Sequence, residues 1–444
     1  MKQSLAIIIA IALAVSGCNK YLDVKPKGIV IPENLNDYEA ILNSQILNLT
    51  FPPALLYCTD EYYDEFDDIN VTTAANAYYW RPGLDPSEKE NPAVWGDLYK
   101  AIYHTNVIIN NIGDVKDGTP AKINQIRAEA LLIRAECYYY LLGIFARAYN
   151  TATAATDPGL PLVRSTNVTD KVPQRASVQE VLDTILNNIH DAIPHLPRHN
   201  INKYRATVYG AYGMLSRIYL YMGDYIRSAE FAEKALEAQH SWLRFYEYAD
   251  VFEMPDTEIS PEVIWMRAGS DYSVPTFMLL SDDLRALYQP NDLRFEMLTG
   301  TNNNGLYWGG LIGSANFGIT IAELYLNQAE ALARAGDYTA AMDTLNKIRI
   351  NRFAPGEYQP LTASSKEEAL DIVLEERRRE LAFLGLRWFD MKRLDREGRM
   401  PLVVRKDRTT LEIKARLEPG SKNYVFQIPA RVQQFNPDMI LNDR

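Results

Sequence analysis

Two segments of the chain repeat one another, and they constrain its fold more than any other feature. Each carries a Gly-Asp-Tyr triplet between two helical patterns, at Gly223-Asp224-Tyr225 and, 113 residues later (336 minus 223), at Gly336-Asp337-Tyr338. Glycine ends a helix readily, aspartate caps the next one, and small residues such as Ser228 and Ala341 let the two helices approach closely. The pattern matches tetratricopeptide units of about 34 residues, of which three or more are normally needed to bury a continuous face.

Helical periodicity continues through most of the remaining sequence. Apolar residues recur at spacings near 3.6 over 94–112, and Gly113 stands where a helix is expected to end. Strand patterns are sparse: residues 411–417 alternate, and 425–428 is predicted to pair with them. The predicted fold is therefore mainly α with minor β elements. Further helices are predicted at 121–147, 178–193, 208–222, 226–238, 319–335, 339–351 and 366–396, the last broken near Gly385.

Two long stretches, 51–92 and 241–318, show neither helical nor strand periodicity. Loops of this length in a compact protein are usually functional or disordered, and abundant aromatic residues argue against disorder. The chain has 28 tyrosines against 23 glycines, together with 14 phenylalanines and 6 tryptophans. Because several of these rings fall in the two stretches, outside any helical period, we expect an irregular ligand-binding region there.

The first 17 residues have the layout of a lipoprotein signal peptide. Lys2 precedes an apolar run from Leu5 to Val15, and small residues then lead to Cys18. The run is too short to span a membrane, so we predict that the signal is removed and that Cys18 carries the lipid. An ordinary secretory signal with an incidental cysteine is the alternative. Residues 18–444 are expected to form one domain held at a membrane by the lipid.

Charge and composition exclude several functional classes. A formal net charge of -11 and a pI near 5.2 argue against nucleic-acid binding. The three cysteines form no zinc or thioredoxin motif, and Pro197 interrupts the helix that would aim His195 and His199 at one metal. We therefore predict no cofactor, no metal and no catalytic residue. Calcium binding is kept as an alternative for an acidic stretch that lacks the spacing of a calcium loop: Asp60, Asp64, Asp67 and Asp68.

Several conspicuous residues on the predicted helices are interpreted as structural. Cys137 is expected to be a buried, unreactive thiol, because free cysteine behaves as a small apolar side chain. On the helix that includes 375–380, Glu375 and Glu376 are each spaced to pair with Arg379. Five tyrosines on repeat helices are expected in the core, where their rings bury large areas: Tyr138, Tyr139, Tyr140, Tyr219 and Tyr221.

Taken together, the motifs resemble the SusD/RagB family, the lipid-anchored surface components of nutrient-import systems in Bacteroidetes. The resemblance runs nearly from end to end. Its most specific block is Glu376-Arg377-Arg378-Arg379-Glu380-Leu381-Ala382-Phe383, followed by Gly385 and Arg387-Trp388-Phe389-Asp390. Matching blocks elsewhere are Cys18 to Pro26, Trp95 to Asn106, Arg127 to Ala130, Arg134 to Glu136, Gly159 to Leu162, Glu323 to Ala331, Leu345 to Arg349, Gln427 to Pro429 and Asn436-Pro437.

This resemblance implies a fold, a function and a partner. The fold would be a right-handed superhelix of about four tetratricopeptide-like helix pairs, formed by 94–147, 178–238, 319–351 and 366–396. The protein would be a non-enzymatic, lipid-anchored binding protein of the outer membrane that faces the cell exterior. It would capture an oligosaccharide or polysaccharide and deliver it to a SusC-like TonB-dependent transporter.

Three alternative hypotheses about the function stay open. A member of the same family that binds peptides fits the same motifs. An exported all-α glycoside hydrolase would also combine aromatic residues with loop carboxylates, since it needs two of them about 5 to 10 Å apart. A tetratricopeptide scaffold that binds only proteins is the third alternative.

The ligand site is predicted in the 60–91 loop together with the segments around Tyr272 and 307–308. These segments hold aromatic rings next to hydrogen-bonding side chains, which is the combination that a sugar or a peptide needs. The candidate binding residues are Asp60, Tyr63, Trp80, Arg81, Asn91, Tyr272, Tyr307 and Trp308.

Overall fold

The computed structural model describes residues 32–64, 71–88, 91–250, 254–269, 279–301, 307–309 and 316–444. Cys18 and the predicted signal peptide lie outside these residues. The helices are α2 (Leu35–Leu42), α3 (Gln45–Asn48), α4 (Ala54–Tyr57), α5 (Thr73–Tyr78), α6 (Ala93–Asn111), α7 (Pro120–Phe145), α8 (Val178–Ala192), α9 (Val208–Met222), α10 (Tyr225–Ala235), α11 (Asp282–Leu287), α12 (Leu293–Leu298), α13 (Ile321–Ala335), α14 (Tyr338–Arg349), α15 (Lys366–Glu380), α16 (Arg387–Arg396) and α17 (Ala430–Phe435). Within the described residues, no helix is both long enough and apolar enough to cross a membrane.

The two repeated triplets form the turns that their residue types predict. Gly223 and Gly336 close α9 and α13 in the left-handed conformation, with φ angles of 82° and 92°. The next residue then caps the following helix. The Asp224 side chain accepts a hydrogen bond from the Arg227 amide at the start of α10, and the Asp337 side chain accepts one from the Ala340 amide at the start of α14. Gly113 differs: it lies within a short 3-10 turn, 112–114, that follows α6, and its φ is not positive.

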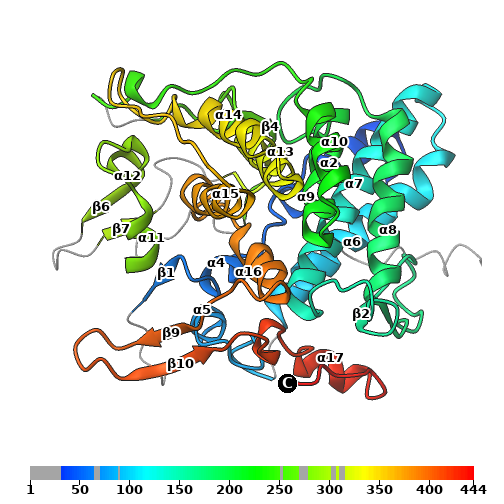
Figure 1. Cartoon of the computed structure of the whole chain (residues 1–444). Coiled ribbons are helices and arrows are strands. Elements are labelled where there is room, and N and C mark those ends of the chain that lie inside the picture. Colours follow the sequence, from blue (N-terminus) through cyan, green and yellow to red (C-terminus); the bar gives the residue numbers. More distant parts are fainter. Residues whose placement is uncertain are drawn as a thin grey trace, which may run out of the picture.

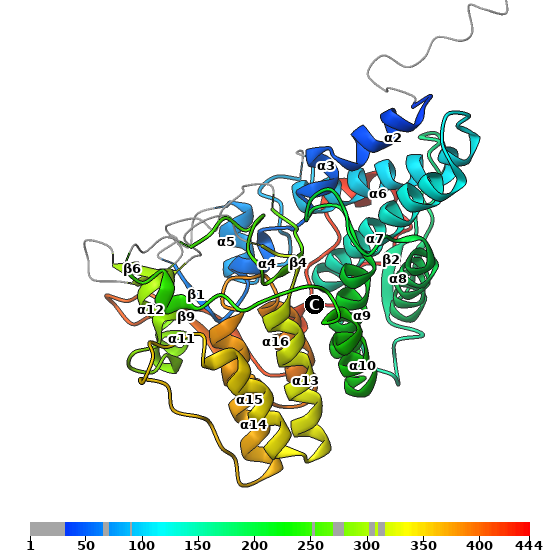
Figure 2. The ribbon, with the colours of Figure 1, turned by 90° about the horizontal axis from the view of Figure 1, so that it is seen from above.

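The helices pack as a curved array of antiparallel pairs (Figures 1 and 2). Successive helices form the pairs α6–α7, α9–α10 and α13–α14, while α8 packs on α7 and α15 packs on α13 and α14. The predicted helix at 366–396 is divided into α15 and α16, as expected, by a turn in which Gly385 has a φ of 77°. The mainly α, tetratricopeptide-like fold class with minor β elements is confirmed.

The strands are short and lie mostly on the side of the molecule opposite α6 to α8 (Figure 1). A four-stranded antiparallel sheet has the order β1-β5-β7-β6. Strand 413–417 pairs with 403–406, so the expected pairing with 425–428 is wrong: that segment forms no strand, and the Phe426 amide instead donates to the Ile144 carbonyl. The strands are β1 (Tyr62–Tyr63), β2 (Pro158–Pro161), β3 (Arg175–Ser177), β4 (Val263–Trp265), β5 (Leu279–Leu280), β6 (Thr299–Thr301), β7 (Tyr307–Gly309), β8 (Ile319–Thr320), β9 (Val403–Lys406) and β10 (Ile413–Leu417).

Buried ion pairs connect the helices through the interior. Arg393 on α16 binds Glu330 on α13, and Arg377 on α15 binds Asp390 on α16 at 2.7 Å. The predicted pairing at 375–380 is confirmed: Arg379 lies 2.9 Å from the buried Glu376 carboxylate and 3.7 Å from that of Glu375. The cysteine and the five helix tyrosines that were assigned to the core are all buried, which confirms those assignments.

Candidate functional site

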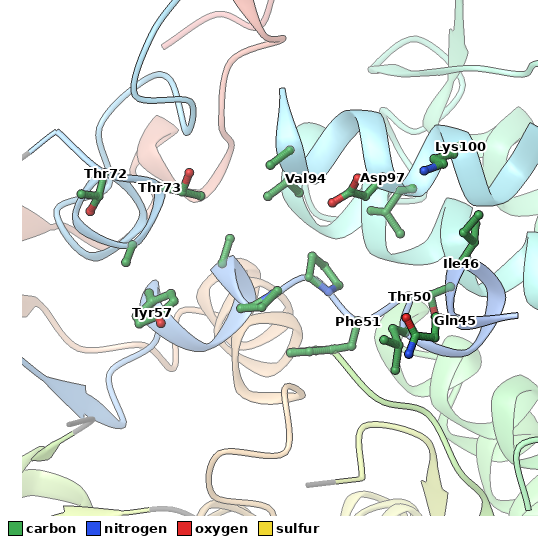
Figure 3. A pocket seen from close by; sticks show the side chains of 17 residues that line it. Gln45, Ile46, Thr50, Phe51, Tyr57, Thr72, Thr73, Val94, Asp97 and Lys100 are labelled. Carbon is green, nitrogen blue, oxygen red and sulfur yellow. The ribbon is translucent and has the colours of Figure 1, made fainter. Parts of the chain in front are cut away.

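A cavity of about 500 Å³ lies between the first turns of α6 and the segment that runs from α3 through α4 (Figure 3). Its third wall is the start of α5 at residues 72–74. Leu49, Phe51, Tyr57 and Val94 supply apolar surface. A concave surface with apolar walls and a few polar groups at its edge is the usual form of a small-molecule site.

Phe51 is fixed below the cavity by contacts that reach across the sequence. Its ring stacks on Phe317 with centroids 3.7 Å apart and meets Tyr140 edge-on at 5.6 Å. The Phe51 amide donates to the Ala268 carbonyl at 3.2 Å, and the neighbouring Thr50 hydroxyl donates to buried Glu136 at 2.7 Å. Three distant parts of the chain therefore hold this wall in place before any ligand binds.

The polar edge of the cavity comes from Gln45, Thr72, Thr73, Asp97 and Lys100. Asp97 and Lys100 are exposed and stand one turn apart on α6, on the side that faces the cavity (Figure 3). Partial burial raises the pKa of Asp97, and the nearby Lys100 ammonium opposes that rise. The Thr72 hydroxyl caps α5 by accepting a hydrogen bond from the Ala75 amide. Carboxylate, ammonium, amide and hydroxyl groups thus surround an apolar floor.

Trp80 is not the exposed aromatic residue that the sequence hypothesis expected, and its neighbour in that hypothesis, Asp60, is buried as well, although Asp60 still lines a cavity of about 660 Å³. The Asp60 carboxylate is buried and accepts two hydrogen bonds from Arg387, at 2.7 and 2.8 Å. Burial opposes its ionisation, but Arg387 and Arg378 outweigh burial and hold the pKa of Asp60 well below its usual range. Trp80 is 2% exposed, and its indole N–H donates to the Cys58 carbonyl at 2.9 Å.

Tyr63, Tyr307 and Trp308 are brought into one sheet, as the hypothesis requires. Residue 279 of β5 pairs with Tyr63 of β1 on one side and with Trp308 of β7 on the other. The half-buried Tyr307 ring packs on Phe295 at 5.0 Å. Tyr63 borders a second cavity, of about 660 Å³, against the β9–β10 hairpin. Tyr272 lies outside the described residues, and ligand contact by any of these residues stays a prediction.

Arg81 and Asn91 occupy different surroundings. Arg81 is half-buried, and its guanidinium donates to the Asn76 side chain at 3.0 Å and lies over the Tyr79 ring. Asn91 is exposed and precedes α6 by two residues, next to the wall of the first cavity. Of the proposed binding residues, Asn91 is therefore the nearest in sequence to that cavity.

Sequence reasoning missed Asp97 and Lys100, because it read 94–112 only for its buried stripe. The signal was present: two opposite charges spaced i,i+3 directly follow the apolar first turn of a helix that comes after a long aromatic loop. Asp67 and Asp68 lie outside the described residues. Within the part of the chain that the structure describes, no three His, Cys, Asp or Glu side chains are grouped to hold a metal ion.

Glu61, next to Asp60, predicts a pH dependence of stability. Burial raises the pKa of Glu61 to about 8, Arg387 opposes this rise, and Asp60 adds to it. An unfolded glutamate titrates near a pKa of about 4.3, so between that pH and 8 the unfolded chain binds fewer protons and stability falls as pH rises. Glu61→Gln removes this loss. We expect the difference in free energy of unfolding between the variant and wild type to grow, in favour of the variant, by on the order of a few kcal/mol from pH 5 to pH 8. Urea unfolding at several pH values measures this difference. A constant difference over that interval would contradict the assignment.

Comparisons with protein-family models and with known proteins cover most of the chain. A model of the SusD family matches residues 291–442, and a model described as "Starch-binding associating with outer membrane" matches residues 20–220. SusD-like protein P2 of Formosa agariphila is 23% identical over 89% of this chain and 91% of its own length. SusD-like protein P25 of the same organism is 24% identical over 59% of this chain, and the alignment spans about half (51%) of that relative.

Solved structures share the fold. A SusD superfamily protein from Bacteroides vulgatus superimposes with a TM-score of 0.75 and 20% identity, covering 93% of this chain and 99% of that structure. A structure described as a laminarin-binding SusD-like protein gives a TM-score of 0.69 at 17% identity, covering 93% of this chain and 99% of its own. At these identities the superpositions establish the fold.

Proposed function

Because the chain belongs to the SusD/RagB family, we propose that it is a lipid-anchored protein of the outer membrane that captures an oligosaccharide or polysaccharide and delivers it to a SusC-like TonB-dependent transporter. The repeat helices would face the transporter, since such arrays offer extended surfaces to large partners, and the loop-rich side would face the ligand.

The observation that carries this proposal is the cavity between α4, α5 and α6. Its apolar floor suits the carbon face of a sugar ring, and Gln45, Thr72, Thr73 and Asp97 offer hydrogen-bonding groups for hydroxyls at the edge. The fixed Phe51 wall keeps the cavity open in advance, which lowers the entropic cost of binding. The laminarin-binding protein of the same fold supports a glucan as one ligand to test.

The composition of the cavity favours binding over hydrolysis. Glycoside hydrolysis requires two carboxyl groups flanking the scissile bond. Among the described residues that line this cavity, Asp97 is the single carboxylic acid. The cavity therefore supports a binding protein over the glycoside hydrolase alternative.

A binding screen with paired variants tests the site. We expect the purified protein to bind at least one polysaccharide of a panel that includes laminarin, measured by calorimetry. Asp97→Ala/Lys100→Ala should weaken that affinity at least about tenfold, because it removes two charged hydrogen-bonding groups. Asp183→Ala/Lys171→Ala, a charge-matched change at exposed positions outside the cavity, should leave the affinity unchanged. Equal affinity in all three proteins would place the ligand elsewhere.

The proposed anchor has its own test. Cys18→Ala removes the thiol that would be acylated, so we expect the variant to be released as soluble protein while the wild type stays with the membrane fraction. Antibody labelling of intact cells then reports whether the anchored protein faces outward. Equal release of both proteins would contradict the lipid anchor.

A further inference from the structure

A third cavity, of about 570 Å³, lies among α6, α7, α8 and the segment around residue 164. Figures 1 and 2 show these three helices side by side, away from the strands of the loop-rich side. Asn110, near the end of α6, lines this cavity, whereas Asp97, near its start, lines the first one. The nearest lining residues of the two cavities on α6 are Lys100 and Ile109, so at 1.5 Å per residue the cavities are about 14 Å apart along the helix.

Polar residues on one face of α7 and on one face of α8 line this cavity. On α7, Asn124, Arg127 and Arg134 lie on one face at intervals of three and seven residues, and on α8 the lining residues are Thr184, Asn187, Asn188 and Asp191. Arg164 completes the wall. Its backbone carbonyl accepts a hydrogen bond from the Asn110 side chain at 3.0 Å, so the segment is held in place.

The floor of the cavity holds hydrogen-bond donors that the protein does not satisfy. Arg134 is 8% exposed, and its two terminal nitrogens donate to the Asn106 and Asn188 side-chain oxygens, each at 2.8 Å. Its Nε and the Asn188 Nδ2 are both buried and have no acceptor among the residues that the structure describes. A buried N–H without an acceptor costs free energy, so two residues that line this cavity keep donor capacity that the described chain does not use.

The positive charge around these donors favours an anionic acceptor. Arg127, Arg134 and Arg164 line the cavity, and none of them forms an ion pair with a described residue, whereas Asp191 is the single carboxylate among the described lining residues. This surplus of positive charge stands out in a chain with a net charge of -11. Burial lowers the pKa of Arg134 below its ordinary value, and Arg164 and Arg127 add to this effect, as expected for a guanidinium that lacks an anion.

We propose that the cavity among α6, α7 and α8 is a second binding site, which takes an oxyanion carried by a small polar molecule, with Arg134 and Asn188 donating from the floor and Arg127 and Arg164 from the rim. Guanidinium groups are the preferred partners of carboxylate and sulfate oxygens. At about 30 Å³ per water molecule, the volume equals that of roughly 19 waters, which is enough for a sugar-sized molecule in addition to its anionic group. This site is separate from the one proposed above and does not depend on it.

Calorimetric titrations with glucuronate, glucose and inorganic sulfate at constant ionic strength test the proposal. We expect saturable binding of glucuronate, no comparable binding of glucose, and at least about a tenfold loss of affinity in Arg127→Gln/Arg164→Gln, whose exposed positions leave the fold intact. Arg244→Gln/Arg416→Gln removes the same charge from exposed positions elsewhere and should bind like wild type.

The remaining outcomes are also decisive. Sulfate binding without glucuronate binding would support an oxyanion site and assign it to a free inorganic anion. The proposal is overturned if no oxyanion binds saturably, if glucose binds as well as glucuronate, or if both double variants behave alike. Asp97→Ala/Lys100→Ala should leave glucuronate binding at this site intact, so failure of one site is distinguishable from failure of the other.

Discussion

Replacing Glu376 with glutamine is expected to lower the free energy of unfolding by about 3–5 kcal/mol, the usual cost of removing one partner from a buried ion pair. The Glu376 carboxylate is fully buried on α15 and lies 2.7 Å from Arg294, 2.6 Å from Arg349 and 2.9 Å from Arg379. Arg294 and Arg379 retain other carboxylates after the substitution. Arg349 has no other ion pair among the described residues, so its charge would stay buried without compensation.

Glu375→Gln is the matched control for this prediction. Glu375 lies on the same helix and contacts the same Arg379, at 3.7 Å, but its side chain is 55% exposed. Solvent screens such a pair, so we expect a change below about 1 kcal/mol. Urea unfolding monitored by circular dichroism measures both variants. Similar effects at the two positions would mean that the ionic network does not stabilise the packing of α15.

Acid unfolding follows from the same cluster. Burial opposes ionisation of Glu376, but Arg294, Arg379 and Arg349 outweigh burial and hold its pKa far below the ordinary value. A carboxyl whose pKa is lower in the folded state contributes stability above its unfolded pKa and loses that contribution as pH falls. Glu376 therefore favours the folded state at neutral pH, in the opposite sense to Glu61.

Local chemistry explains which helices could be predicted from the sequence. The helix 208–222 was predicted with the bounds of α9, because both of its ends are set by neighbouring residues: the Thr207 side chain accepts from the Gly210 amide, and Gly223 takes the left-handed conformation. The four-stranded sheet was not predicted. Its strands have two or three residues each and come from three separate segments, so no period is long enough to detect.

The candidate site was predicted less well than the fold, because burial in a loop depends on distant residues. The sequence placed Trp80 and Asp60 in an aromatic, polar loop, which is where exposed binding groups are often found. The sequence could not reveal that Arg387 would pair with Asp60, or that the Arg405 guanidinium would pack on the Trp80 ring. Each arginine is more than 300 residues away along the chain. The structure brings Tyr63 of this loop into one sheet with β7, whereas Trp80 and Asp60 are buried.

Arg405 makes Trp80 part of a structural clamp. Its guanidinium lies 4.4 Å from the Trp80 ring centroid and donates to the backbone carbonyls of Tyr57, Thr59, Tyr62 and Tyr78. Trp80 itself has a φ of 51°, a left-handed conformation that is unfavourable for a bulky residue, and Arg444 donates to its carbonyl at 2.8 Å. The surrounding contacts therefore hold the tryptophan in a conformation that it would not adopt alone.

Trp80→Ala should for this reason act on stability and leave ligand binding nearly unchanged. We expect a loss of about 3–5 kcal/mol, the range found when a buried aromatic residue is truncated, because the variant leaves a cavity beneath Arg405. Trp80→Phe keeps most of the ring and loses the indole donor to Cys58, so it should cost less, about 1–3 kcal/mol. Urea unfolding measures the stability of each variant, and calorimetry below its unfolding transition measures the affinity of the folded protein for the glycan found in the screen. If Trp80→Ala keeps its stability but loses the glycan, the ring must leave the core to meet the ligand, and the loop would then be a binding element in spite of its burial.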